Sequence, residues 1–282
     1  QQQRQPQRQQ QRVFSMLSAT DSWISHADAS TRAGVLLGKA GGSCARGCTS
    51  GEKLHWWGKG VTDEDCLSLA KALSAQSGRE LKNLLLGTNS VGDACVRALA
   101  SSARAGHLKE LRSLGLSGNR ITDDGCEAWA GAWRDGGASL IDLYLSRQRG
   151  DGLTDRCATS LAAAIGAAGG SLRRLSMGDS ALSMSGLGAL LQAAASGSSA
   201  LRELSLNNNS ICGRPSPPVV EALRRIADSA ASCSANRSCA GRQRSLRLSI
   251  RKQHGCKAAE EQAAAAAWRA LQTELPRLEI AI

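Results

Sequence analysis

The chain has 282 residues, an aromatic content of only 3% and a formal net charge of +11. A single globular core would usually contain more aromatic residues, whereas a stack of layers built from Leu and Ala does not need them. No apolar run approaches the roughly 18 residues of a membrane-spanning helix, and no secretory signal pattern is visible. We therefore expect no membrane span and a cytoplasmic protein, with the nucleus as the second possibility.

The N-terminal part of the chain differs in composition from the rest. Residues 1–12 contain only Gln, Arg and Pro, so they cannot bury a core and are predicted to be disordered. Residues 13–51 begin with apolar residues and continue into a Gly-, Ala- and Ser-rich segment, which predicts an N-terminal cap followed by a linker. Residues 52–282 are predicted to form the repeats.

The repeats share the pattern L-x-x-L-x-L-x-x-N, which is clearest at residues 81–89, 111–119 and 201–209. The second Leu of the pattern marks seven units and the start of an eighth, at Leu54, Leu84, Leu114, Leu143, Leu175, Leu204, Leu248 and Leu278. Successive markers lie 29 to 32 residues apart, except for one interval of 44 residues that contains an insertion at about 212–245. Units of this length predict a strand, a turn and an α-helix. The strands are expected near 53–57, 83–87, 113–117, 142–146, 174–178, 203–207 and 247–251.

The turn after each strand is also patterned. The Asn of the pattern is expected to bond the backbone of adjoining turns, at Asn89, Asn119 and Asn209. In other units the same position holds Lys59, Gln148, Ser180 and Gln253. This difference predicts distorted turns in those units. Acidic residues follow the turns, and we interpret them as helix-start residues and not as a site, because the first turn of a helix favours negative charge.

The helices are identified by apolar residues at helical spacing. Leu67 marks the first helix, and a Trp pair at Trp129 and Trp133 marks the third. Two Trp residues four positions apart on one helix are predicted to be core residues and not a cofactor site.

Four cysteines recur once per repeat near the start of a predicted helix, at Cys66, Cys95, Cys126 and Cys157. This recurrence predicts small packing residues, and we expect all ten cysteines to be reduced thiols of an intracellular protein. Two further pairs have spacings that would suit zinc, Cys44 with Cys48 and Cys233 with Cys239. No His or second Cys pair stands at a suitable distance from them, so no metal and no cofactor are predicted.

Basic residues crowd the segment from Arg237 to Lys257. Such a cluster fits an acidic protein surface, nucleic acid or an anionic membrane, and it fits a merely solubilising loop equally well. Nucleic acid is the less favoured ligand, because the predicted sheet face lacks a run of stacking aromatic residues.

The outward strand positions are predicted to line the concave face of the sheet and to form the candidate partner-binding surface. Its chosen members are His55, Trp57, Leu85, Tyr144, Arg174, Asn207, Arg247, Arg251 and Arg277. Trp, Tyr and Arg are typical of the residues that dominate protein interfaces. Because the cations gather toward the C-terminal end, we expect an acidic protein partner there, with Trp57 and Tyr144 as the next candidate site.

Motifs for catalysis are missing from the sequence. There is no phosphate-binding loop, no H-E-x-x-H motif and no G-x-S-x-G motif, and the four His residues fall in different units. We therefore expect neither an enzyme nor a small-molecule substrate.

The repeated unit, extended to L-x-x-L-x-L-x-x-N-x-I-[TG]-D, resembles the ribonuclease-inhibitor-like class of leucine-rich repeats over residues 52–282. The resemblance implies an α/β solenoid of horseshoe shape, with a parallel β-sheet on the concave face and α-helices on the convex face. The class includes ribonuclease inhibitors, the repeat regions of NOD-like receptors and Ran GTPase-activating proteins.

This resemblance indicates the fold of the chain much better than it indicates its function. A protein–protein interaction scaffold is the leading expectation, and a GTPase-activating protein for a Ran-like GTPase is the alternative. Those activators typically carry an acidic C-terminal tail, whereas this chain is basic in its C-terminal part, and none of their functional residues can be assigned to a position here.

Overall fold

The computed structural model describes residues 53–75, 81–150, 152–167, 171–196, 199–235, 245–256 and 258–282, without the side chains of 75, 231–235 and 258–261. The predicted tail at 1–12 and the predicted cap and linker at 13–51 lie outside the described residues, as do Cys44, Cys48 and Cys239.

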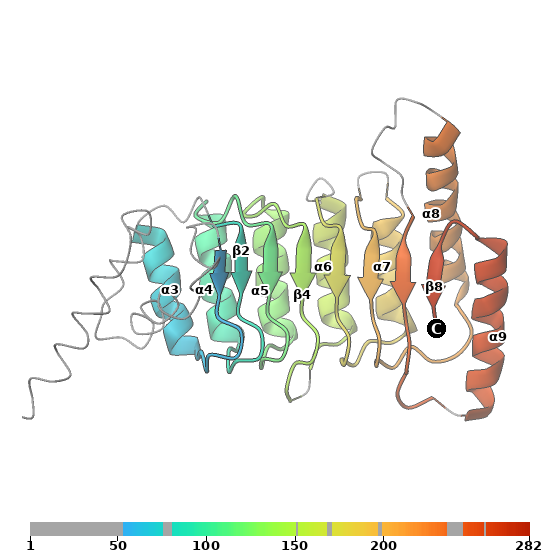
Figure 1. Cartoon of the computed structure of the whole chain (residues 1–282), viewed down its shortest axis with the longest axis horizontal. Helices are drawn as coiled ribbons and strands as arrows, with labels where there is room; N and C mark the ends of the chain where they lie inside the picture. The colour runs from blue at the N-terminus through green and yellow to red at the C-terminus, as the bar shows by residue number, and fades with distance from the viewer. Residues whose placement is uncertain are drawn as a thin grey trace, which may run out of the picture.

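Strands and helices alternate along the described chain (Figure 1). The strands are β1 (Lys53–His55), β2 (Asn83–Leu85), β3 (Ser113–Gly115), β4 (Asp142–Tyr144), β5 (Arg174–Ser176), β6 (Glu203–Ser205), β7 (Arg247–Ser249) and β8 (Glu279–Ala281). The helices are α3 (Asp63–Ala75), α4 (Asp93–Arg104), α5 (Asp123–Arg134), α6 (Asp155–Ala167), α7 (Met184–Ala194), α8 (Pro217–Ala235) and α9 (Ala258–Glu274). The strands form one parallel sheet in the order β1 to β8, which confirms the predicted α/β solenoid.

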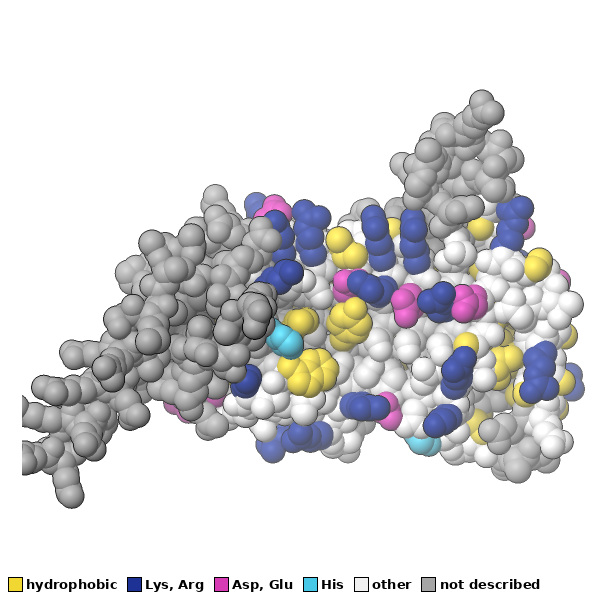
Figure 2. Space-filling model, viewed as in Figure 1, with side chains coloured by type: hydrophobic (Ala, Val, Ile, Leu, Met, Phe, Trp, Pro, Cys, Tyr) yellow, Lys and Arg dark blue, Asp and Glu magenta, His cyan; other side chains and the backbone are white. Residues whose placement is uncertain are grey.

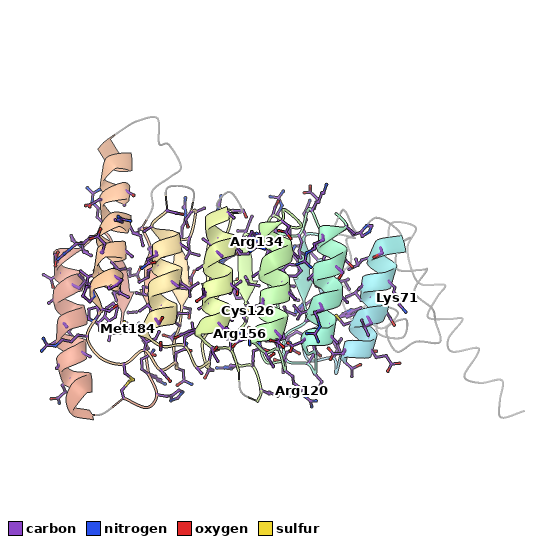
Figure 3. The ribbon with its side chains drawn as sticks, turned by 180° about the vertical axis from the view of Figure 1, so that it is seen from behind. Lys71, Arg120, Cys126, Arg134, Arg156 and Met184 are labelled. Carbon is purple, nitrogen blue, oxygen red and sulfur yellow. A yellow bond between two sulfur atoms is a disulfide. The ribbon has the colours of Figure 1, made fainter. Side chains whose placement is uncertain are left out.

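All described helices cover the same face of the sheet, as the front and rear views show (Figures 1 and 3). We call the opposite face, which is seen in Figure 2, the open face. It carries the outward strand positions that were predicted to bind a partner.

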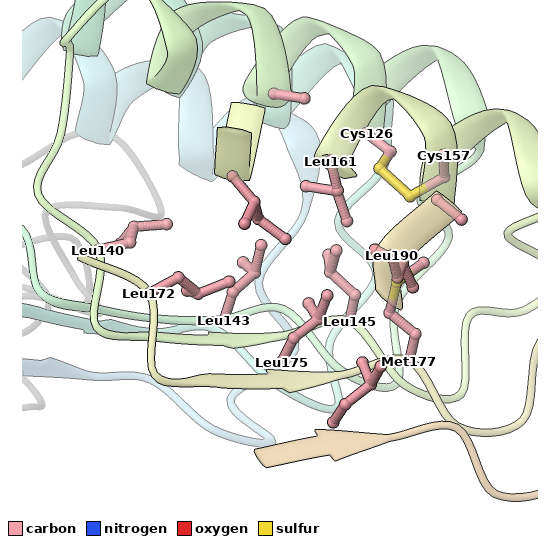
Figure 4. Close-up of a cluster of buried hydrophobic side chains, with 14 of the residues drawn as sticks. Cys126, Leu140, Leu143, Leu145, Cys157, Leu161, Leu172, Leu175, Met177 and Leu190 are labelled. Atoms are coloured by element: carbon pink, nitrogen blue, oxygen red, sulfur yellow. A yellow bond between two sulfur atoms is a disulfide. The ribbon is translucent and has the colours of Figure 1, made fainter. Parts of the chain in front are cut away.

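The core lies between the sheet and the helices. The marker Leu residues pair strand to strand, so that Leu84 lies beside Leu114 and Leu114 beside Leu143, and all three are fully buried. Figure 4 shows Leu143, Leu145 and Leu175 of the sheet side in this layer. The Trp pair of α5 is buried as predicted. Leu67 was expected to face the core, but it is 41% exposed, so that prediction is wrong.

A ladder of side-chain amides ties neighbouring repeats together. Asn119, which is fully buried, accepts a hydrogen bond from the Val91 N–H (3.1 Å) and donates to the carbonyls of Leu86 (3.0 Å) and Leu116 (2.8 Å). Gln148 makes the same set of bonds one repeat later, accepting from the Ile121 N–H and donating to Leu116 and Leu145.

Two of the four turns that were predicted to be distorted therefore still carry a side-chain amide of the ladder. Gln148 and Gln253 act as rungs, because the extra methylene of Gln still lets the amide reach both repeats. Ser180 is too short for this role, and its buried hydroxyl has no partner among the described residues.

In seven repeats, including the two in which Lys59 and Ser180 stand in place of the amide, the position of the rung follows a residue with positive φ. These residues are Gly58, Thr88, Gly118, Arg147, Asp179, Asn208 and Lys252, with φ between 55° and 73°. A left-handed residue at the end of a strand turns the chain sharply, and this turn directs the following side chain inward.

The acidic residues at the helix starts have a second structural role. Asp93 accepts hydrogen bonds from the N–H (2.9 Å) and hydroxyl (2.6 Å) of Thr122 in the next repeat. Asp123 and Asp155 accept from the backbone of the following repeats in the same way. The prediction that these acids are structural is confirmed, and they also hold adjacent repeats together.

Six described cysteines form disulfides, so the expectation of reduced thiols is wrong for them. The pairs are Cys66 with Cys95, Cys126 with Cys157 (Figure 4), and Cys212 with Cys256. In the first two pairs the cysteines occupy equivalent positions of adjacent repeats, so stacking leaves their Cα atoms 5.3 and 5.5 Å apart, within the usual disulfide range of roughly 4.4–6.8 Å. The expectation of a cytoplasmic protein rested partly on reduced thiols, and these bonds remove that support.

The last repeat is shifted from its predicted register. Ile280, and not Leu278, pairs with Leu248, and the Glu279 N–H donates to the carbonyl of Leu246. Arg277 consequently lies in the turn before β8 and does not occupy an outward strand position.

Candidate functional site

The N-terminal half of the open face carries an apolar patch made of Trp57, Leu85 and Tyr144. Trp57 is 48% exposed, although it is held closely against the sheet. A Cβ atom added to Gly87 would lie 2.3 Å from the Trp57 ring, so the ring lies directly over the glycine of the next repeat. A Cβ added to Gly115 would likewise lie 2.9 Å from Leu85.

Glycine thus provides space for two large side chains to lie flat on the neighbouring strand. Figure 2 shows hydrophobic side chains gathered beside a histidine on this part of the face. His55 pairs with Leu85 in the strand register and is exposed at the edge of the patch. The structure therefore brings four of the nine predicted site residues, His55, Trp57, Leu85 and Tyr144, onto the same part of the open face.

The C-terminal half of the open face carries a row of alternating charges. The row consists of Asp142, Arg174, Glu203, Arg247 and Glu279, the first residues of β4 to β8. Figure 2 shows this alternation of acidic and basic side chains across the face. We call it the charge row.

The arginines of the charge row are paired with its acids. Arg174 donates two hydrogen bonds to Asp142, from Nε to Oδ1 (2.6 Å) and from Nη2 to Oδ2 (2.8 Å). Arg247 donates from Nε to Oε2 of Glu279 (2.8 Å). These hydrogen bonds raise the pKa of both guanidinium groups above their usual value. Two of the four arginines expected to attract an acidic partner, Arg174 and Arg247, are therefore already paired with acids on the same face.

The remaining predicted residues fall into different settings. The Asn207 side-chain oxygen accepts hydrogen bonds from the Ser249 hydroxyl and the Arg251 N–H, each at 2.7 Å, so Asn207 links β6 to the next repeat. Arg251 is exposed beyond the end of β7. Arg277 does not join the open-face group, because of the shift in register of the last repeat.

Tyr144 lies where the apolar patch meets the charge row. Burial raises the pKa of its phenol above the ordinary value of 10.0, with a further upward contribution from Asp142 on the same strand and an opposing contribution from Arg174. The phenol is therefore neutral at physiological pH and can serve the patch as a hydrogen-bonding aromatic group.

A pocket of about 380 Å³ lies among the first residues of the C-terminal strands. It is lined by Ile141, Asp142, Arg173, Arg174, Arg202, Glu203, Ser245, Leu246, Arg247 and Glu279. Arg173 and Arg202 were not among the predicted site residues. Their position in the repeat could have identified them, since each stands directly before the first residue of a strand.

No three His, Cys, Asp or Glu side chains of the described part are grouped as metal ligands. None of the described helices combines the length and apolarity needed to cross a bilayer. The zinc alternative at Cys233 and Cys239 is not tested, because neither side chain lies within the described set.

No protein-family model matches the chain, and no curated protein sequence matches it.

Proposed function

We propose that the chain is a protein–protein interaction scaffold whose partner docks on the open face at the apolar patch. The observation that supports this most strongly is Trp57, a large side chain that is 48% exposed yet fixed over Gly87. Burying an ordered aromatic ring against a partner releases water and immobilises little that was free before. Exposed aromatic residues of this kind are typical centres of protein interfaces.

The proposed partner offers apolar side chains to the patch. The patch has two large apolar members and one aromatic hydroxyl, while the surface beside it is made of Ser and Gly in β3. Such a surface favours a protein segment that inserts apolar groups between the projecting side chains of the apolar patch. We do not assign the leading role to an acidic partner, because Arg174 and Arg247 already donate to Asp142 and Glu279.

The same proposal includes membership of the ribonuclease-inhibitor-like leucine-rich repeats. It is supported by the repeated sequence unit and by the amide ladder that its Asn residues form. A scaffold role is consistent with a stack of repeats that presents one continuous sheet face.

The test uses the partner recovered by affinity capture and mass spectrometry, titrated against purified variants. We expect Trp57→Ala and Leu85→Ala each to weaken binding by about 30-fold, which corresponds to ~2 kcal/mol at an interface centre. Leu67→Ala is the matched control, because it makes the same change as Leu85→Ala at an exposed Leu of α3 on the helix-covered side.

Two results would count against the proposal. Equal loss of affinity in Leu85→Ala and Leu67→Ala would place the site outside the apolar patch. Faster single-turnover GTP hydrolysis by a Ran-like GTPase in the presence of the chain would favour the alternative, a GTPase activator.

A further inference from the structure

The disulfide between Cys212 and Cys256 differs from the other two described disulfides in its exposure. The four cysteines of the other pairs are at most 2% exposed, whereas Cys212 and Cys256 are both half-buried. The bond joins the turn after β6 to the turn after β7, with the two Cα atoms 5.3 Å apart. A thiol in solution can therefore reach this bond, while access to the other two requires the repeats to open.

The two turns that carry Cys212 and Cys256 are basic. Arg214 follows Cys212 by two residues, and Arg251 and Lys252 precede Cys256 by five and four residues. All three side chains are exposed, and none of them forms an ion pair with a described residue. The sequence has no Asp or Glu between β6 and α8 or between β7 and α9. Positive charge around a disulfide attracts an anionic thiolate and stabilises the thiolate that leaves, so it favours thiol–disulfide exchange.

The same disulfide lies where the helix layer is interrupted. Each helix from α3 to α7 packs along the helix that follows it, whereas α8 and α9 do not pack in this way within the described residues. Figure 1 shows the long helix α8 extending past the edge of the helix layer. Arg224 of α8 donates to Glu274 of α9 (2.9 Å), but both side chains are about half exposed, and surface ion pairs of this kind contribute little stability. The covalent bond therefore provides a link that helix packing provides between the earlier units.

On the sheet side, noncovalent bonds attach the last unit, which we define as β7, α9 and β8. β7 pairs with β6, and Gln253 accepts a hydrogen bond from the Ile211 N–H (2.9 Å). Asn207 accepts from the Ser249 hydroxyl and the Arg251 N–H. Such bonds break and re-form when a unit opens locally, whereas a disulfide restricts how far the opened unit can separate. Breaking the disulfide should therefore make opening of the last unit more frequent.

We propose that Cys212–Cys256 is a reversible redox site that controls the attachment of the last unit to the stack. The reductant is a low-molecular-weight thiol of the glutathione class. Its thiolate attacks one sulfur and forms a mixed disulfide, and the other cysteine leaves as a thiolate that takes up a proton. A second thiol then displaces the remaining cysteine, so two thiols are oxidised to one disulfide while two electrons and two protons pass to Cys212 and Cys256. The inference does not depend on the scaffold proposal, because Trp57 and Leu85 belong to the first two units.

The first experiment follows the disulfides of the folded full chain in mixtures of reduced and oxidised glutathione. Freed thiols are alkylated at intervals, and the chain is then denatured, fully reduced and alkylated with a mass-shifted reagent for peptide mass spectrometry. The buried Cys126–Cys157 bond is the control within the same molecule. We expect Cys212 and Cys256 to be released at least about tenfold faster than Cys126 and Cys157, because exchange requires access to the sulfur.

The role of the basic turns is tested with two thiols of different charge. Arg214→Gln and Arg251→Gln should each slow reduction by the anionic glutathione about threefold, and should slow reduction by the uncharged dithiothreitol less. Lys71→Gln is the matched control, because Lys71 is an exposed cation on α3, remote from both turns (Figure 3).

The effect on the stack is measured by hydrogen exchange with mass spectrometry. Selective reduction should speed exchange of the β7 and β8 amides at least about tenfold and leave β2 and β3 unchanged, because opening is confined to the unit that was released. The double variant Cys212→Ser/Cys256→Ser should show the same pattern without any reductant. Reoxidation with oxidised glutathione should restore slow exchange in the unaltered chain.

Three results would overturn the inference. The first is release of Cys126 and Cys157 as fast as that of Cys212 and Cys256. The second is unchanged exchange in β7 and β8 after reduction, which would leave the bond without control over the last unit. The third is equal slowing by Lys71→Gln and Arg214→Gln, which would show that the local positive charge does not select this disulfide.

Discussion

Replacement of Asn119 by Ala tests the amide ladder directly. Ala removes one acceptor and two close donor contacts from a residue that is fully buried. The consequences for the three backbone groups differ. The Leu86 carbonyl keeps a bond from Asn89, and the Leu116 carbonyl keeps one from Gln148. The Val91 N–H, in contrast, loses the bond that Asn119 supplied.

The cost follows from these differences. One buried N–H left without a partner costs about 1–3 kcal/mol, and each of the two other lost bonds about 0.5–1.5 kcal/mol. We therefore expect Asn119→Ala to lower the free energy of unfolding by ~2–6 kcal/mol. The assay is urea unfolding followed by circular dichroism, with the m-value checked so that a lower midpoint reflects stability and not a change in cooperativity.

Asn83→Ala is the matched control for this change. Asn83 is half-buried on the open face at the start of β2, where its side chain makes no bond within the described part of the chain. The same chemical change there should alter stability by no more than about 0.5 kcal/mol. Equal urea midpoints for the two variants would refute the view that the ladder is a principal link between repeats.

Three further predictions follow from the same structure. Leu114→Ala should cost about 2–5 kcal/mol as a buried truncation, whereas Ser117→Ala on the open face should stay within about 0.5 kcal/mol, and equal denaturation midpoints would contradict the inside–outside assignment. Alkylation of the denatured chain without reductant should modify no more than four of the ten cysteines, and mass spectrometry showing ten modified thiols would disprove the three disulfides. Tyr144 is the only tyrosine, so ultraviolet absorbance reports its ionisation alone. Its pKa should lie above 10.0 and fall in Asp142→Asn. Because the unfolded chain ionises first, this group should lower stability only as the pH rises past about 10, and an unchanged pKa in Asp142→Asn would argue against the charge row.

The inside–outside order of the sheet could be predicted because period-2 alternation leaves little choice once one face is buried. The pattern places Leu114 inside and Ser113 and Gly115 on the open face, and the strand pairing agrees. The register of the last repeat could not be decided in this way. The run Leu278-x-Ile280 offers two candidate markers, and a shift of two residues keeps the same side chains inward.

Contacts between repeats were harder to predict than contacts within a repeat. The Asn consensus predicted a distorted turn at Gln148, although the longer amide of Gln148 reaches the same partners. The disulfides and the charge row share this cause. Each depends on the residue at the equivalent position of the next repeat, which lies 29 to 44 residues away in sequence but in the neighbouring repeat in space.

Most of the residues predicted for the open face occupy it, with Arg277 as the exception, but the pairing of its charges was not predicted. Asp142 and Glu279 occupy outward positions beside the arginines, and their pairing became evident only when the strands were laid side by side. A count of cations along the sequence therefore overstated the positive charge that this face offers to a partner.

The interrupted rung at Ser180 has a consequence for how two neighbouring repeats are held together. A repeat stack behaves as a chain of nearest-neighbour couplings, and it separates most easily at the interface with the weakest coupling. The Ser180 hydroxyl has no described partner, so the boundary between β4 and β5 lacks the amide link found at Asn119, Gln148 and Asn209. On the open face this boundary is still bridged by Arg174 and Asp142. The same boundary is also bridged by the hydroxyls of Ser146 and Ser176 (2.8 Å) and by Asp155, which accepts a hydrogen bond from the Ser183 N–H (2.8 Å), so several other links at one interface take the place of the missing amide.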